Sequence, residues 1–267
     1  MTVIQLERIR RALWVVGQPL TRLPAQPAAP VSDLFVWRNS GEWQTSFELI
    51  DLPALFTEGG ESDSRYATLF CFDQGGRCFL QKRLDLLANR RQTIEIASLV
   101  GVDHGEVGTF AVFHSTTPST VTALGSYLTE RGYVSYRYRG APIRAYVHGN
   151  LDAIALGADE RLELLGARGL LPREYRLQHE MKGPALYELG LVNPTSAVQR
   201  CTFQLASTQN GTILASQCVN LESRGAVLIP YQIDESEPAR VIIKSRMVMA
   251  RPLVYRIQKL QLDVFHG

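Results

Sequence analysis

Long hydrophobic runs are absent from this sequence of 267 residues. A membrane-spanning helix needs roughly 18 consecutive apolar residues, and no stretch approaches that length. The arginine-containing N-terminus is followed only by the short apolar run ALWVV, with no small-residue cleavage site after it. We therefore expect a cytoplasmic protein without a membrane span.

Cysteine is scarce, and its spacing excludes the usual zinc pairs. The four cysteines, Cys71, Cys78, Cys201 and Cys218, stand in apolar or alternating stretches and form no CxxC pair. Such residues are typical of buried thiols in a reducing compartment. A disulfide between Cys71 and Cys78, across a hairpin at DQGG, is the alternative.

An excess of charge of one sign is also missing. The 28 Lys and Arg residues against 26 Asp and Glu residues give a formal charge of +2, so a general nucleic-acid binder is not indicated. Signatures of chemistry are missing as well: there is no GxSxG elbow, no HExxH, no phosphate loop and no GxGxxG between a strand and a helix. We expect no cofactor and no enzymatic activity.

What the sequence does contain is a long series of β-strand patterns. Runs rich in Val, Ile, Phe, Tyr and Thr recur after residue 33, separated by Gly, Asp, Asn or Pro. The first set of predicted strands is 34–38, 43–51, 66–73, 78–84, 92–97, 108–114, 132–139 and 143–148. The second set is 175–181, 186–193, 199–206, 211–219, 226–232, 239–246, 252–257 and 260–265. The fold class is therefore mainly β.

Short helices are predicted at three places. Apolar residues at helical spacing indicate a helix within residues 4–16, and the Pro-rich stretch that follows reads as a linker. PSTVTALGSYLTERG at 118–132 and ADERLELLGARG at 158–169 indicate one or two connecting helices. We expect three regions: a helical arm and linker at 1–33, a first unit at 34–157 and a second at 158–267.

The two strand sets resemble copies of one unit. Four identical pairs are separated by 135 residues: Gln74/Gln209, Gly76/Gly211, Leu86/Leu221 and Ile94/Ile229. Each copy runs from a strand through a Gln-x-Gly turn to further strands. This order predicts two related, jelly-roll-like β-sandwich units, and the rival interpretation is one large sandwich with generic strand patterns.

The second set also carries a family resemblance, through the stretch that begins LVNPTSAVQRCTFQLASTQNGTILASQCVNLESRGAVLIPYQ and continues to RVIIKSRMVMARPLVY. With its Asn-containing turn, alternating strand, Arg-Gly turn and late IxS strand, it resembles the sensory rhodopsin transducer family. The resemblance implies a small jelly-roll-like barrel, related in shape to carbohydrate-binding modules. It also implies assembly as an oligomer and no enzymatic activity.

The candidate binding surface is the stretch RGYVSYRYRGAPIRAYVHGN at 131–150. Alternation along a hairpin places its polar and aromatic side chains on one face. Arginine suits anionic groups and tyrosine suits sugar rings, so the partner is predicted to be a sugar or another anionic ligand. Cross-strand pairs that only stabilise an exposed sheet are the alternative. The candidate residues are Tyr133, Arg137, Arg139, Arg144, Tyr146, His148 and Asn150.

Two other functions remain open at this point. His114 and His148 each end a predicted strand, so with Asp103, His104 or Glu130 they could bind a metal or act as an acid/base pair. With Asp152 they could instead form the site of a carbohydrate-active hydrolase or lyase. A purely structural protein is the third possibility, in which sandwich edges and the N-terminal arm form a homo-oligomer or contact a protein partner. The preferred function is a non-catalytic ligand-binding or assembly module.

Overall fold

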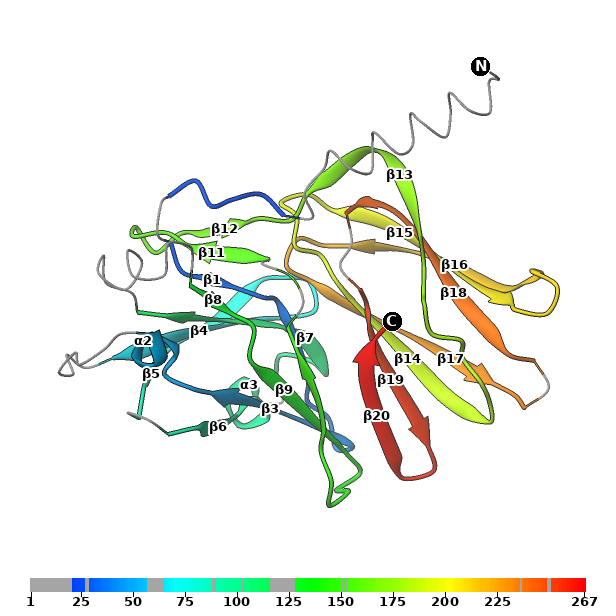
Figure 1. Ribbon diagram of the computed structural model, residues 1–267, viewed down its shortest axis with the longest axis horizontal. Coiled ribbons are helices and arrows are strands. Elements are labelled where there is room, and N and C mark those ends of the chain that lie inside the picture. The colour runs from blue at the N-terminus through cyan, green and yellow to red at the C-terminus, as the bar shows by residue number, and fades with distance from the viewer. Residues whose placement is uncertain are drawn as a thin grey trace.

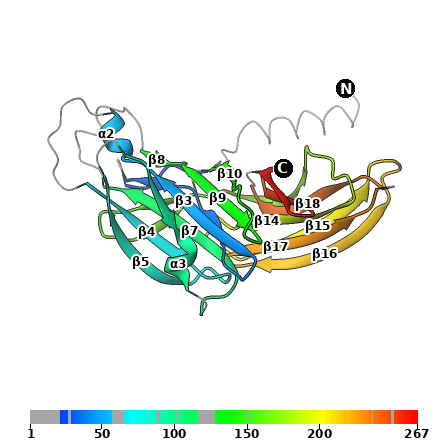
Figure 2. The same cartoon turned by 90° about the horizontal axis from the view of Figure 1, so that it is seen from below.

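The computed structural model describes residues 21–26, 29–56, 65–87, 90–101, 103–115, 128–149, 151, 153–235, 237–248 and 251–267. Strands dominate this part of the chain, with two short helices, α2 (Leu52–Phe56) and α3 (Ile96–Val100). Figures 1 and 2 show the strands up to β10 on one side of the molecule and β13 to β20 on the other.

The described strands form five four-stranded sheets. The first has the order β2 (Phe35–Arg38), β7 (Val107–His114), β4 (Tyr66–Phe72), β5 (Cys78–Asp85), and the second β10 (Ala145–His148), β9 (Tyr133–Tyr138), β3 (Trp43–Leu49), β6 (Gln92–Glu95). The third has the order β13 (Arg168–Arg176), β18 (Ala239–Met247), β15 (Gln199–Ser207), β16 (Ile213–Leu221). The fourth has β17 (Ala226–Ile233), β14 (Ala185–Val192), β19 (Leu253–Gln258), β20 (Gln261–His266), and the fifth β12 (Leu162–Leu164), β11 (Ile154–Leu156), β1 (Val31–Ser32), β8 (Thr129–Glu130).

The expected pair of jelly-roll-like β-sandwich units is wrong. The chain is mainly β, but its strands are arranged as five small sheets, as in a five-bladed β-propeller. The fifth sheet consists of β1, β8, β11 and β12, none of which the sequence patterns mark. These strands have only two or three residues each, too few for an alternating pattern to stand out.

The sheets nevertheless correspond in strand order. Numbered along the chain within each sheet, β2-β7-β4-β5 and β13-β18-β15-β16 both have the order first, fourth, second, third. In the same way β10-β9-β3-β6 and, taken in reverse, β17-β14-β19-β20 both have the order fourth, third, first, second. Gly76 and Gly211 adopt nearly the same positive φ, 78° and 76°, in the turns before β5 and β16. These correspondences are what an internal duplication predicts.

The helix predictions have mixed outcomes. Residues 4–16 and most of 118–132 lie outside the described residues, but Thr129–Glu130 is strand β8. The predicted helix at 158–169 is wrong, because a turn there leads into strand β12. The division at residue 157 stays a prediction. Within the ranges that are described, no helix has the length and apolar character to cross a membrane.

Aromatic residues on the inward faces of the strands build the main core. Trp37, Phe47 and Phe110 are almost fully buried, and the indole nitrogen of Trp37 donates a hydrogen bond of 3.0 Å to the carbonyl of Phe72. The same cluster includes Tyr255 of β19, so the core of the first two sheets continues into the fourth. Strands β3 and β9 are buried along most of their length, and β14 has only buried and partly buried positions, so all three contribute to this core.

A buried ion pair joins strands β2 and β14 at this core. The guanidinium of Arg38 in β2 lies 2.5 Å from the carboxylate of Glu188 in β14. The guanidinium also lies 3.4 Å from the ring centroid of Trp43 and 4.9 Å from that of Tyr255. The charge of Arg38 is therefore compensated by both a carboxylate and two aromatic faces, which holds β2 against β14 and β19.

Candidate functional site

The predicted hairpin exists as strands β9 and β10. Its register pairs Val134 with Val147 and Tyr133 with His148. Val134, Tyr136 and Tyr138 are buried, as the alternation predicts. The hairpin therefore presents one polar and aromatic face to solvent.

Two exposed tyrosines stand diagonally on that face. Tyr133 is 55% exposed and Tyr146 is 48% exposed. Tyr133 is opposite His148 and Tyr146 is opposite Ser135, so the two tyrosines are one diagonal step apart on the same face. We call the face carrying Tyr133, Tyr146, Gln44, Arg137, Arg144 and Glu95 the tyrosine face.

The three predicted arginines already have partners. Arg144 reaches across the sheet, donating to the Ser46 hydroxyl and lying 2.9 Å from the carboxylate of Glu95 in β6. Arg139 is paired with Glu42 at 2.7 Å, and Arg137 donates to the side-chain oxygen of Gln44. Arg139 also lies past the end of β9, in the turn, with a positive φ of 49°. The arginines are thus occupied within the sheet rather than presented together as free anion-binding groups.

The two histidines at strand ends do not share a site. The ring of His114 is buried against Glu130, with Nε2 and Oε2 2.5 Å apart. His148 is exposed at the end of β10, and its Nδ1 lies 2.5 Å from the carbonyl of Gly149. Among the residues whose placement is described, no three His, Cys, Asp or Glu side chains gather to hold a metal ion. Asn150 and Asp152 lie outside the described residues.

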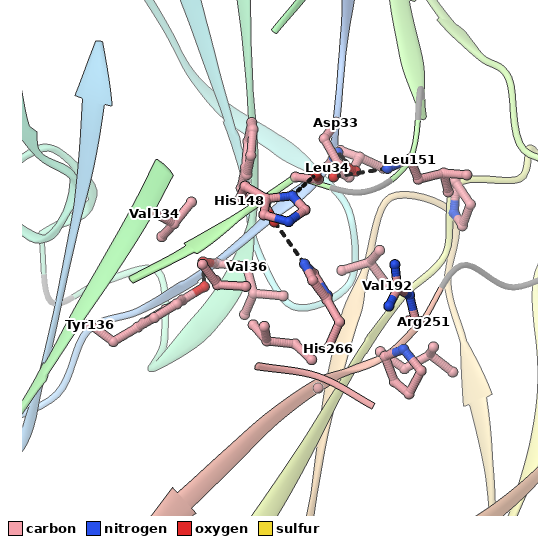
Figure 3. A pocket seen from close by; sticks show the side chains of 18 of the residues that line it. Asp33, Leu34, Val36, Val134, Tyr136, His148, Leu151, Val192, Arg251 and His266 are labelled. Carbon is pink, nitrogen blue, oxygen red and sulfur yellow. Dashed lines mark hydrogen bonds between the residues drawn. The ribbon is translucent and has the colours of Figure 1, made fainter. Parts of the chain in front are cut away.

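A cavity opens beside the hairpin, and His148 lies on its wall (Figure 3). Strands β2, β9 and β10 line one side, while β14, β19 and β20 line the other. It holds about 580 Å³ of empty space, part of which is open to solvent. Three basic side chains line it, His148, His266 and Arg251, together with the acidic Asp33.

The histidines of the cavity are linked to each other. Nε2 of His266 donates a hydrogen bond of 2.8 Å to the carbonyl of His148, and the two ring centroids lie 5.3 Å apart. Burial is the main cause that lowers the pKa of His266. Hydrogen bonds to the backbone of His148 and Arg251 raise this pKa, and the charges of the same two side chains lower it.

Sequence patterns missed Asp33, Arg251 and His266 as members of one site. His266 ends the last strand, as His114 and His148 end theirs, and this was the one available signal. Nothing in the local pattern brings residue 266 to residue 148, because the contact depends on how β20 lies against β10.

All four cysteines are free, so the alternative of a Cys71–Cys78 disulfide is wrong. Burial raises the pKa of Cys71 to about 12 and also raises the pKa of Cys201. Cys218 on β16 is exposed, and Arg200 donates a hydrogen bond of 3.1 Å to its sulfur. This hydrogen bond lowers the pKa of Cys218.

Comparisons with known proteins give no family for this chain. No protein-family model matches it, and no curated protein matches it. A solved structure, "The structure of a beta-glucuronidase from glycoside hydrolase family 2", aligns with 93% of this chain at 9% identity and a TM-score of 0.15. The chain spans only 27% of that structure's length. This TM-score is too low to indicate a shared fold. The resemblance to the sensory rhodopsin transducer family is tested by none of these comparisons and stays a prediction.

Proposed function

We propose that this protein is a non-catalytic binding module that recognises a neutral carbohydrate on the tyrosine face. The observation that carries the proposal is the pair of exposed tyrosines, Tyr133 and Tyr146, one diagonal step apart on one face of the sheet. Tyrosine rings stack on the apolar faces of sugar rings, and their hydroxyl groups remain available for hydrogen bonds.

The charge pairing on this face favours a neutral ligand over an anionic one. Glu95 compensates the charge of Arg144 on this face, and Glu42 compensates that of Arg139 beside it, so an anion would have to compete with those carboxylates. Arg137 is held by the neutral amide of Gln44. A sugar hydroxyl both donates and accepts, so it can bind to paired polar groups without separating them. This narrows the sequence-based prediction of a sugar or anionic ligand to the sugar.

The location of His114 counts against a hydrolase or lyase site formed by His114 and His148 together. The ring of His114 is buried against Glu130 and does not line the cavity that contains His148. A general acid or base must reach the proton that it transfers, and a buried ring in an ion pair cannot meet a sugar on the tyrosine face.

Affinity electrophoresis in gels that contain soluble polysaccharides, together with a glycan array, tests the proposal. We expect the wild-type protein to be retarded by at least one neutral polysaccharide, and Tyr133→Ala and Tyr146→Ala each to lose about tenfold in affinity. Tyr133→Phe and Tyr146→Phe should keep most of the retardation, because the stacking ring remains.

Ile143→Ala is the matched control, since Ile143 is 80% exposed in the turn of the same hairpin and lies outside the tyrosine face. The proposal fails if no glycan binds to the wild-type protein. It also fails if the two alanine variants bind as tightly as the control.

A further inference from the structure

The cavity beside the hairpin has a largely apolar wall. Its apolar lining comes from both sides, and includes Val36, Val134 and Val147 on one side and Leu191, Val192 and Leu253 on the other. A recess walled by aliphatic groups and carrying a few polar ones has the lining that is typical of sites for small molecules.

Basic side chains outnumber acidic ones in the lining of the cavity. His148, His266 and Arg251 contribute basic groups, and the labelled side chains in Figure 3 show the first two next to each other. The charges of His148 and Arg251 disfavour the protonated form of His266, whereas hydrogen bonds to the backbone of the same two residues favour it. An anion bound here would oppose the effect of those charges.

The single acidic side chain of the lining, Asp33, is held by backbone donors. Asp33 is buried, and its carboxylate accepts hydrogen bonds from the backbone amides of Leu34, at 2.7 Å, and Leu151, at 3.2 Å. Backbone donors thus already stabilise the charge of Asp33. Gly149 is needed here because a Cβ atom would come within 2.6 Å of the Asp33 carboxylate.

We propose that this cavity is a second binding site, next to the tyrosine face, for a small carboxylate with an apolar body. The carboxylate lies against the imidazoles of His148 and His266 with Arg251 nearby, and the apolar body lies against the valine and leucine side chains. Nε2 of His148 has no hydrogen-bond partner among the described residues, so its protonated form can donate to the carboxylate.

The aliphatic wall of the cavity favours a carboxylate that has an apolar body over inorganic phosphate. Phosphate offers no surface to the aliphatic wall, so its binding would rest on charge alone. A carboxylate attached to a ring or a short chain gains binding free energy from its charge and from its apolar body, since each buried methylene contributes about 0.8 kcal/mol.

Benzoate, benzamide and inorganic phosphate are the probes that test this inference. The imidazole signals of His148 and His266 are followed by NMR during titration of each probe into the full-length protein at pH 6. We expect benzoate to shift both signals at millimolar concentrations. Benzamide has the same shape without the charge and should bind about tenfold more weakly, and phosphate should bind weakly or not at all.

Variants locate the site. His266→Gln and Arg251→Gln should each weaken benzoate binding several-fold, and Tyr146→Ala, on the tyrosine face, should leave it unchanged. Thermal melting of each variant distinguishes lost binding from lost folding, and a His266→Gln protein that does not fold leaves Arg251→Gln as the test. The inference is wrong if benzoate does not bind, if benzamide binds equally well, or if both folded variants bind benzoate as the wild type does.

Discussion

The guanidinium of Arg144 lies 2.9 Å from the carboxylate of Glu95, at the opposite edge of a four-stranded sheet. Ser135 and Ser46 lie beneath this contact, and both are fully buried. Arg144 also donates to the Ser46 hydroxyl. The sequence predicts Arg144 as a ligand contact, but in the structure its side chain covers the buried hydroxyl groups of Ser46 and Ser135.

A double-mutant cycle on this pair tests that role. We expect Arg144→Ala to lower the free energy of unfolding by about 1 kcal/mol, with a coupling to Glu95→Gln of about 0.5 kcal/mol, because both side chains are partly exposed. Urea denaturation of the two single variants and the double variant measures it. A coupling of zero would mean that the ion pair does not stabilise the sheet.

Arg38 and Glu188 should be far more sensitive to substitution. The Arg38 side chain is 7% exposed and the Glu188 side chain 17%, so removal of either leaves a charge with little access to water. We expect Glu188→Ala to cost about 3–5 kcal/mol in urea denaturation. The double variant Arg38→Met/Glu188→Leu should recover most of that loss, since it removes both charges. A loss of less than 1 kcal/mol for Glu188→Ala would contradict the burial of this pair.

The thiols should react in a fixed order. Arg200 lowers the pKa of the exposed Cys218, so at pH 7.5 a larger fraction is thiolate than in an ordinary cysteine. We expect iodoacetamide to label Cys218 first and Cys78, whose pKa burial raises, more slowly. Cys71 and Cys201 should react only on unfolding. Arg200→Gln should slow labelling of Cys218, and peptide mass spectrometry follows all four sites.

Stability should fall as the pH is lowered from 7 to 5. Burial lowers the pKa of His266 and of His179, so the unfolded chain binds protons at these positions more readily than the folded protein. The loss of stability therefore begins near the unfolded histidine pKa of about 6.5 and levels off below the folded value. Denaturant titrations at several pH values should show a smaller loss for His266→Gln than for the wild type. An equal loss in both proteins would show that His266 does not contribute.

Many of the strands could be predicted because they are runs rich in Val, Ile, Phe, Tyr and Thr, separated by turn residues. Alternation places β9 and β10 correctly, and with them Tyr133 and Tyr146. It cannot reveal partners across the sheet, because Glu95 is 49 residues from Arg144 and Glu42 is 97 residues from Arg139. The cavity is even harder to predict from the sequence, because its two histidines are 118 residues apart. Strands of two or three residues carry no periodic signal, which is why the fifth sheet and the arrangement of sheets were missed.

The two glycines that match between the strand sets should differ in their tolerance of a side chain. Both have positive φ, which costs an alanine about 1–2 kcal/mol. A Cβ on Gly211 would meet nothing within 4 Å, whereas a Cβ on Gly76 would collide with the backbone carbonyl of Ser223. The backbone there is fixed, because the Ala226 amide donates to the Gln74 carbonyl at 3.2 Å. Gly76→Ala should therefore cost a further 1–3 kcal/mol, roughly, beyond Gly211→Ala. Urea denaturation of both variants measures the difference, and equal losses would mean that the turn at residues 73–77 does not pack against residues 222–225.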